Sequence, residues 1–211
     1  MSEILYGRHA VTESLRAARR RPQRLLFAAG TEQAAIIEEL MTLADAQKVP
    51  VEDVSRHDLT RWAGTEQHQG VALETSAYPY AEVYEMLDRA TEREETPLLL
   101  LLDLIQDVHN LGSLIRTAEA VGVHGVVIQD RRAAGITPAA VNTSSGAAEH
   151  MLIAQVANLA QEIANLKDAE VWVAGLEDVY GAQIYTEVDL TMPLALVVGS
   201  EGEGLRRLVR E

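Results

Sequence analysis

Three glycines fall within six residues in one short segment, Gly199-Ser200-Glu201-Gly202-Glu203-Gly204, which directly follows an apolar run at 194–198. Glycine has no side chain, so this segment can turn sharply and bring its backbone close to a ligand. The spacing is not that of a phosphate-binding P-loop, which needs Lys and Ser/Thr after the last glycine, and it is not that of a dinucleotide fingerprint. Taken alone, the segment fits either a ligand-binding loop, with Glu201 as a charged acceptor, or a tight turn.

A second candidate segment runs from Asp107 to Arg116 and follows the apolar run at 98–102. Asn110 is of a residue type favoured at a helix N-cap, and we expect it to begin a helix here. Arg116 lies six residues further along this otherwise apolar helix, so its long side chain can reach back toward the strand ends. The alternative is an ordinary surface arginine, paired with Glu119 or Asp107.

Positive charge is concentrated near the N-terminus, although the chain carries a net charge of −14. The first 76 residues contain 9 Lys and Arg against 11 Asp and Glu, whereas residues 77–211 contain 9 against 21. This balance argues against a simple nucleic-acid binder. Five arginines nevertheless fall within nine residues: Arg16, Arg19, Arg20, Arg21 and Arg24. They form either a phosphate-contacting patch or a solvated helix end, where cations suit the helix dipole.

Composition argues against several other classes of site and location. The chain has no cysteine, which excludes disulfides and thiolate metal sites and fits a reducing cytoplasm. None of the six histidines has the spacing of metal ligands, so we expect no metal. We also expect no signal peptide and no membrane span, because the longest apolar run is only strand-sized. The small residues of Thr143–Ala148 permit close packing of another chain or of a ligand.

The first 76 residues have the pattern of a compact α/β domain. Apolar spacing predicts helices at 9–20, 32–47 and 58–63, and strands at 23–28, 51–54 and 70–73. Thr31 is placed to cap the second of these helices. The stretch that follows is acidic, with apolar residues at helical spacing, and we interpret 77–96 as a linker that contains a short amphipathic helix.

From residue 97 onward, apolar runs alternate with helical segments, at 98–102, 125–128, 151–154, 171–174 and 194–198. Runs without polar alternation indicate strands buried on both faces, so we predict a parallel sheet covered by helices. In such sheets, ligands bind at the carboxyl ends of the strands. Both candidate segments lie at such ends, as does Gly175-Leu176 after the fourth run.

Together these segments resemble the SpoU (TrmH-type) RNA ribose 2′-O-methyltransferases of the knotted SPOUT superfamily. Residues 107–118 are similar to the family's first motif and residues 196–204 to its second. Residues 145–149 and 156–159, between these motifs, also match.

The resemblance extends to the N-terminal part, where Tyr6-Gly7-Arg8-His9-Ala10-Val11 and His68-Gln69-Gly70-Val71 are similar to the small RNA-binding domain often fused to these enzymes. It therefore covers nearly the whole chain in the right order. The continuation at 202–208 favours the bacterial 23S rRNA guanosine-2′-O-methyltransferases.

The resemblance implies that S-adenosylmethionine is the methyl donor and that the acceptor is a ribose 2′-hydroxyl of RNA, in a guanosine of 23S rRNA. The implied catalytic residues are Asn110, Arg116 and Glu201. The implied donor-binding residues are Gly175, Leu176, Gly199, Ser200, Gly202 and Gly204. The implied RNA-binding residues are Arg8, Arg16, Arg19, Arg20, Arg21 and Arg24. Members generally dimerise, so a cytoplasmic homodimer is expected.

The chain departs from the family pattern in two places. Val108 stands where the family usually has proline, a change that removes no reactive group. The third motif, a strand and helix with a Ser-Leu-Asn sequence that threads the trefoil knot, does not occur in these 211 residues. We therefore expect an RNA substrate-binding domain at 1–76, a linker at 77–96, and an α/β SPOUT domain at 97–211 that lacks its C-terminal knot segment. A tRNA 2′-O-methyltransferase of the same family and a non-catalytic RNA-binding or ribosome-assembly protein are the alternatives.

Overall fold

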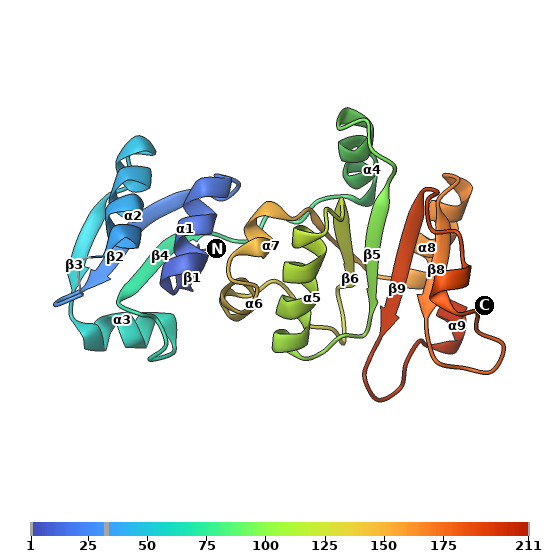
Figure 1. Ribbon diagram of the computed structural model, residues 1–211. Coiled ribbons are helices and arrows are strands. Elements are labelled where there is room, and N and C mark those ends of the chain that lie inside the picture. The colour runs from blue at the N-terminus through green and yellow to red at the C-terminus, as the bar shows by residue number, and fades with distance from the viewer. Residues whose placement is uncertain (1, 32–33, 211) are drawn as a thin grey trace. The chain divides into compact units, whose positions relative to one another are not determined.

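The computed structural model describes residues 2–31 and 34–210. Contacts divide the chain into two units: Met1–Pro79 with Ile136–His150, and Tyr80–Gly135 with Met151–Glu211. The helix start predicted at residue 32 lies outside the described residues. Figure 1 shows the elements of both units.

The first unit contains a four-stranded mixed sheet in the order β1-β4-β2-β3. Its strands are β1 (Ser2–Tyr6), β2 (Pro22–Ala28), β3 (Val51–Val54) and β4 (Val71–Ser76). β4 pairs antiparallel with both β1 and β2, and β3 is parallel to β2. No strand is predicted at β1, because residues 2–6 are too few and too mixed to show alternation. These residues pair with residues 72–76 of β4, and this pairing forms the strand.

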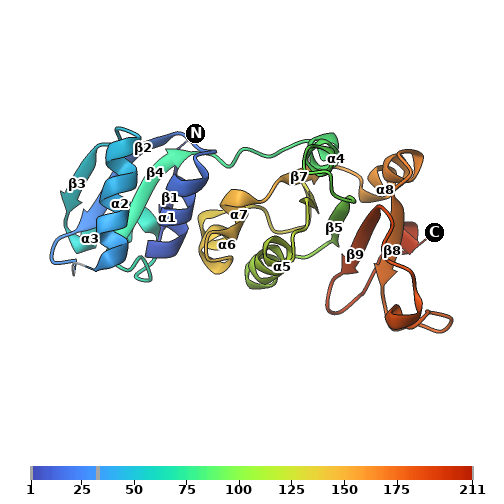
Figure 2. The ribbon, with the colours of Figure 1, turned by 45° about the horizontal axis from the view of Figure 1, so that its top comes forward.

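Three helices of the first unit pack on the two faces of this sheet. The helices α1 (Arg8–Ala17) and α2 (Ala35–Ala46) lie side by side (Figure 2). The helix α3 (Arg56–Ala63) buries Leu59 against Leu26 and Ala72. Because side chains alternate along a strand, Leu25 and Leu73, also buried, point to the other face.

Several helix boundaries differ from the prediction, and the structure gives the reason at two of them. The first helix ends at Ala17 rather than at residue 20, because Ala18 adopts the left-handed conformation, with φ 50°. Thr31 does not cap α2, whose N-cap is Ala34. The Thr31 hydroxyl instead donates a hydrogen bond of 2.7 Å to the Ala28 carbonyl. The prediction of that cap is therefore wrong.

The second unit contains a five-stranded parallel sheet in the order β7-β6-β5-β9-β8, which confirms the predicted α/β class. The strands are β5 (Leu98–Asp103), β6 (Gly125–Gln129), β7 (Ile153–Val156), β8 (Trp172–Leu176) and β9 (Leu194–Gly199). All five predicted runs form strands, with boundaries shifted by one or two residues. β5 and β9 lie inside the sheet, where both faces are covered.

Helices cover both faces of this sheet. The helices α4 (Val83–Glu92) and α8 (Leu159–Asp168) contribute to one core with β5, β6 and β9, and α5 (Val108–Ala120) packs beside β6 on the other face (Figure 1). Met86 of α4 lies so close over β6 that a Cβ at Gly125 would be 2.1 Å from its sulfur. The helix predicted within the linker therefore packs on the sheet. The 3-10 helix η1 (Tyr185–Glu187) and the short helix α9 (Arg207–Arg210) complete the unit. Across the described ranges, every helix falls short of the length and apolar character needed to span a membrane.

A buried histidine fixes the turn that leads into β4. The Nδ1 atom of His68 accepts a hydrogen bond of 3.0 Å from the Gly70 backbone, and its Nε2 lies 3.0 Å from the Thr60 hydroxyl. Nδ1 must therefore be unprotonated. Burial, assisted by the positive charge of Arg56, lowers the pKa of His68 below its ordinary value of 6.5.

We predict that the first unit loses stability as the pH falls through about 6.5, because the unfolded chain takes up a proton that the folded His68 excludes. His68→Gln should lower the free energy of unfolding by about 1–3 kcal/mol at neutral pH and abolish this component of the pH dependence. Urea unfolding of a Trp172→Phe background, followed by Trp62 fluorescence, reports on this unit alone. The exposed His57→Gln is the control, and an equal pH dependence in the wild type and His68→Gln would refute the assignment.

Candidate active site

Two loops meet at the carboxyl edge of the parallel sheet of the second unit. Asp103 at the end of β5 is in register with Gly199 at the end of β9. The loops that leave these strands line a cavity of about 360 Å³, which is bounded by residues 104–107, Asn110 and residues 200–203. Because the two strands are neighbours, segments that lie about 90 residues apart in the chain form one site.

The glycine-rich loop is a tight turn whose glycines are needed for different reasons. The Gly204 amide donates a hydrogen bond of 2.9 Å to the Ser200 carbonyl, and Gly204 has φ +64°. A Cβ at Gly199 would lie 2.2 Å from the Gly204 carbonyl carbon, so a larger residue there would displace the loop. A Cβ at Gly202 would meet nothing within 4 Å. Gly202 therefore leaves open space beside the cavity that the protein itself does not fill.

A buried carboxylate holds this loop against β5. The side chain of Asp103 is fully buried. Its Oδ2 accepts a hydrogen bond of 2.9 Å from the Arg206 backbone, and its Oδ1 accepts one of 2.8 Å from the Arg206 Nε. Arg206 Nη2 lies 2.7 Å from the same Oδ1. A buried carboxylate requires such charged and hydrogen-bonded partners. Neither residue was predicted to have a role. A carboxylate at the end of an apolar strand, such as Asp103, indicates a buried charge that needs a partner.

The loop after β5 is held by the neighbouring strand. Leu104 has a positive φ of 56°, unusual for a branched residue. Its amide donates a hydrogen bond of 3.0 Å to the side-chain oxygen of Gln129, at the end of β6. The Ile105 carbonyl accepts another, of 2.8 Å, from the Ala134 amide. These contacts fix the path of the chain toward α5.

Asp107, not Asn110, is the N-cap of α5, so the predicted cap is wrong. The Asp107 carboxylate accepts a hydrogen bond of 2.9 Å from the Asn110 backbone amide. Asn110 is then the third residue of the helix, with its side chain available for another contact. Both residue types favour the N-cap position, so composition alone did not separate them.

The side chain of Asn110 connects the two loops. Its Nδ2 donates a hydrogen bond of 2.8 Å to Glu201 Oε1, and both residues line the cavity. Two of the three predicted catalytic residues are thus in direct contact. The carboxylate keeps its second oxygen for another donor.

Arg116, the third predicted catalytic residue, is exposed on α5 and does not line the cavity. Six residues along a helix correspond to about 9 Å along the axis and about 120° of rotation from Asn110. Asn110 and Arg116 therefore occupy different faces of one helix.

The predicted donor-binding residues are distributed around the ends of β8 and β9. Ser200 and Gly202 line the first cavity, with Gly199 and Gly204 at the base of their loop. Gly175 lines a second cavity, of about 390 Å³, between β8, α8, α9 and residues 179–182. Leu176 is half exposed at the end of β8, where it is in register with Val198.

Glu177 closes one side of this second cavity. It accepts a hydrogen bond of 2.9 Å from the Leu205 amide and two from Arg210, of 2.7 and 2.6 Å. The Arg210 guanidinium and the Leu205 amide hold the pKa of the Glu177 carboxyl below its usual value. The sequence analysis did not select Glu177. Its position directly after Gly175-Leu176 was the available signal.

Most predicted RNA-binding arginines of the first unit have acidic or carbonyl partners. Arg16 pairs with Glu13 and Glu39, and Arg24 pairs with Glu52 and Glu74. The two pairs of Arg24 raise its pKa further. These ion pairs are exposed or partly exposed, so a phosphate can compete for the guanidinium groups.

The other arginines of the set differ in their exposure. Arg8 donates a hydrogen bond of 3.3 Å to the Gln69 carbonyl beside an open cavity, and Arg21 is exposed. Arg19 is partly buried, next to Tyr78. Arg20 keeps only 1% of its side chain exposed, so it has a role inside the fold and is not available as a surface cation.

The small-residue run at 143–148 packs within the first unit. Gly146 has φ +88°, and a Cβ there would lie 2.5 Å from the Cβ of Glu13. The run therefore serves close packing against α1.

Within residues 2–31 and 34–210, no group of three or more His, Cys, Asp or Glu side chains is arranged to hold a metal ion.

Comparisons with known proteins agree with this architecture. Residues 97–211 match the model of the SpoU rRNA Methylase family, and residues 4–81 match that of the RNA 2′-O ribose methyltransferase substrate-binding domain. A TrmH family tRNA/rRNA methyltransferase of Bacillus subtilis is 41% identical over 209 residues, which cover 99% of this chain and 82% of that protein. A tRNA/rRNA methyltransferase of Mycolicibacterium gilvum is 40% identical, over 100% of this chain and 66% of that protein.

A solved structure supports the fold independently. The SpoU methyltransferase AviRb from Streptomyces viridochromogenes, in complex with the cofactor AdoMet, superposes with a TM-score of 0.78. The alignment covers 99% of this chain and 77% of that protein at 22% identity. At this identity the likeness establishes the shared fold.

We predict that alanine has different structural effects at two of the three glycines of the 199–204 loop, Gly199 and Gly202. Gly199→Ala must displace Gly204, so hydrogen exchange of residues 200–206 should accelerate by about tenfold or more. Gly202→Ala adds a methyl group in open space and should leave exchange within about twofold of the wild type. Amide exchange followed by mass spectrometry compares the two variants directly. Equal effects of the two substitutions would contradict the geometry of the loop.

Proposed function

The chain belongs to the SpoU rRNA Methylase family, and on this basis we propose that it transfers a methyl group from S-adenosylmethionine to a ribose 2′-hydroxyl of RNA. We propose a guanosine of 23S rRNA as the acceptor. The observation that carries the proposal is the contact between Asn110 and Glu201, which joins the two family motifs at one cavity. The 2′-hydroxyl is also the group that distinguishes RNA from DNA.

The residues of the cavity fit such a donor. A volume of about 360 Å³ lies in the range of small-molecule sites. The backbone around Gly202 has open space beside it, so a ligand can approach the peptide groups directly. Residues 200–203 line this cavity and would hold the donor there, with Gly199 and Gly204 at the base of their loop. Gly175 and Leu176 would contact the donor from the neighbouring strand end, where Gly175 lines the second cavity. When bound, S-adenosylmethionine supplies a methyl group on a positively charged sulfur, ready for displacement.

The protein then has to position the acceptor in line with that methyl group. A displacement of this kind depends strongly on the alignment of the reacting atoms. Asn110 orients the Glu201 carboxylate, and the remaining oxygen of Glu201 accepts a hydrogen bond from the ribose. The Asp103–Arg206 ion pair keeps the loop that carries Glu201 in place.

Arg116 acts as a cation rather than as a base in this proposal. A guanidinium has a pKa above about 12 and does not take up a proton at neutral pH. It can bind the phosphate next to the target ribose. It can also stabilise the negative charge on the 2′-oxygen as the hydroxyl proton passes to the Glu201 carboxylate and the methyl group leaves the donor sulfur. Its exposed position on α5, outside the cavity, suits a contact with the RNA backbone.

The arginines of the first unit hold the RNA. Arg8, Arg16, Arg19, Arg21 and Arg24 remain the proposed contacts, whereas the buried Arg20 leaves the set. Such contacts provide affinity by neutralising phosphates and contribute little sequence information. We further propose that the enzyme works as a homodimer.

A methyl-transfer assay tests the proposed function. Purified protein is incubated with labelled S-adenosylmethionine and with unmodified 23S rRNA, unmodified tRNA or the corresponding DNA. The proposal requires label at a ribose 2′-oxygen in rRNA and none in DNA. If only tRNA becomes labelled, the substrate is tRNA instead of 23S rRNA. If the protein binds RNA but transfers no label, it is a non-catalytic RNA-binding protein.

The same assay separates the role of Arg116 from that of the donor site. Arg116→Ala should reduce turnover by at least about 100-fold, because the stabilisation of transition-state charge is lost, while donor affinity stays within about twofold. Arg131→Ala is the control, since the Arg131 side chain is 90% exposed elsewhere in the same unit. Loss of donor binding in a folded Arg116→Ala protein would overturn the assignment.

The RNA-binding role of the N-terminal arginines makes a prediction about salt. Replacing Arg8, Arg16 and Arg21 together by glutamine should weaken RNA binding and reduce the slope of log K against log salt by about 2–3. The matched control replaces three exposed arginines of the second unit, Arg93, Arg131 and Arg132. An unchanged slope in the first triple variant would show that the cluster is only a solvated surface.

A further inference from the structure

One segment of the chain lies between two strands of the second unit in the sequence but makes its contacts in the first unit. Residues 136–150 connect β6 to β7 of the parallel sheet, yet their contacts place them in the first unit. The segment forms the helices α6 (Pro138–Thr143) and α7 (Ala147–His150), which pack on β1 and α1. A connection within one sheet thus supplies part of the other unit.

The packing of this segment is close and specific. The Asn142 side chain donates a hydrogen bond of 3.1 Å to the Tyr6 carbonyl, and a Cβ at Gly7 would lie 2.4 Å from that side-chain nitrogen. His150 lies 2.8 Å from the Glu13 carboxylate. The Asn142 contact requires glycine at position 7, and both contacts depend on the position of the segment.

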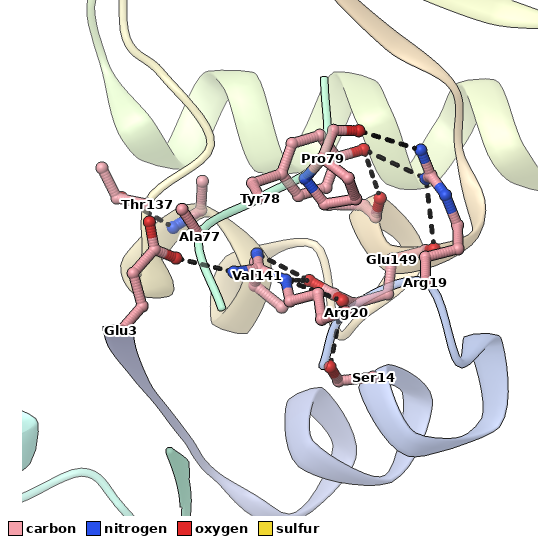
Figure 3. Close-up of polar contacts among 12 residues, drawn as sticks. Glu3, Ser14, Arg19, Arg20, Ala77, Tyr78, Pro79, Thr137, Val141 and Glu149 are labelled. Atoms are coloured by element: carbon pink, nitrogen blue, oxygen red, sulfur yellow. Dashed lines mark hydrogen bonds and ion pairs between the residues drawn. The ribbon is translucent and has the colours of Figure 1, made fainter. Parts of the chain in front are cut away.

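A buried ion pair joins the segment to the residues between α1 and β2 (Figure 3). Arg20 and Glu149 each expose 1% of their side chains. Arg20 Nε donates to both carboxylate oxygens of Glu149 at 3.0 Å, and Nη2 lies 2.9 Å from Oε1, within ion-pair range but outside hydrogen-bond geometry. The Ser14 hydroxyl donates to Glu149 Oε2 at 3.0 Å. Arg20 also pairs with Glu3 at 2.6 Å.

Backbone groups at two exits from the first unit are bound in the same cluster. Arg19 Nη1 donates to the Glu149 carbonyl at 3.3 Å, and its Nη2 donates to the Pro79 carbonyl at 3.2 Å. The Tyr78 hydroxyl donates to the Ala148 carbonyl at 2.9 Å. The centre of its ring lies 5.5 Å from the guanidinium carbon of Arg19 and 5.1 Å from that of Arg20. Burial raises the pKa of Tyr78 to about 12, so this donor persists across the neutral range.

We propose that Arg20 and Glu149 are positioning residues that fasten the 136–150 segment, a connection of the methyltransferase sheet, into the RNA-binding unit. The functional part of this inference rests on the proposed function. Pro79 is the last residue before one exit from the first unit, Glu149 is the last but one before the other, and Arg19 binds the carbonyls of both. The cluster therefore fixes both points at which the chain leaves the first unit.

Because the ion pair is buried, we expect its loss to affect the 136–150 segment more than the rest of the chain. Removing Arg20 leaves the Glu149 carboxylate buried without this cation, and neutralising Glu149 leaves the buried Arg20 with its pair to the partly exposed Glu3. Either change is more costly than losing a surface pair. The penalty is avoided if the segment detaches and the remaining charge is hydrated. Loss of the pair should therefore release the segment locally instead of unfolding the parallel sheet.

Hydrogen exchange of the full chain, without RNA or donor, tests the link. In Glu149→Gln, exchange of residues 136–150 should accelerate by about 100-fold or more, while exchange of β5 and β9 stays within about threefold of the wild type. Glu92→Gln, an exposed carboxylate of α4, is the control. Unchanged exchange of the segment, or equal acceleration in β5 and β9, overturns the proposal.

A second variant and a kinetic readout complete the test. Arg20→Lys keeps the charge but loses the bidentate geometry, so exchange of the segment should lie between those of the wild type and Glu149→Gln. This variant carries the test if Glu149→Gln fails to fold. In methyl transfer, both variants should raise the KM for RNA by about tenfold or more with kcat and donor affinity within about twofold. A lowered kcat at unchanged KM overturns the positioning role, whereas a wild-type protein without transfer activity overturns the proposed function and leaves the exchange result decisive.

Discussion

The buried carboxylate of Asp103 is the constraint on which the candidate active site depends. It ends an interior strand of the parallel sheet and has no access to water, so it must be satisfied by the protein. Arg206 satisfies it with its backbone amide and its guanidinium. Because Arg206 directly follows the glycine-rich loop, this ion pair sets the position of Glu201, and through Glu201 that of Asn110.

The first unit repeats this arrangement with Arg20 and Glu149. In both units a buried carboxylate meets an arginine from a segment about 100 residues or more distant in the chain. The chain therefore uses part of its limited positive charge to join segments rather than to bind RNA. This use explains why an arginine-rich N-terminal stretch presents fewer exposed cations than its composition predicts.

The sequence predicted the parallel sheet well, because continuous apolar runs such as 98–102 and 194–198 are typical of strands buried on both faces. It failed where tertiary pairing decides local structure. β1 forms because β4 pairs with it along its whole length. Asn110 was mistaken for the N-cap because Asp107, three residues earlier, favours that position equally. The association of residues 136–150 with the first unit could not be predicted, since the segment lies between two strands of the second.

The sequence by itself determined the chemistry that is available: a glycine-rich loop with Glu201, a helix start with Asn110, and a family resemblance that links them. Local residue types carry this information because glycine permits a close approach of the backbone, and amide and carboxylate side chains supply hydrogen-bonding groups at strand ends. Only the tertiary structure decided which charged side chains are buried in ion pairs inside the fold. Ion-pair partners are chosen by proximity in space, and neither Asp103–Arg206 nor Arg20–Glu149 leaves a signature in sequence spacing. Because its partner Glu149 could not be identified from the sequence, Arg20 was predicted to contact RNA. Its burial beside Glu149 gives it a structural role instead.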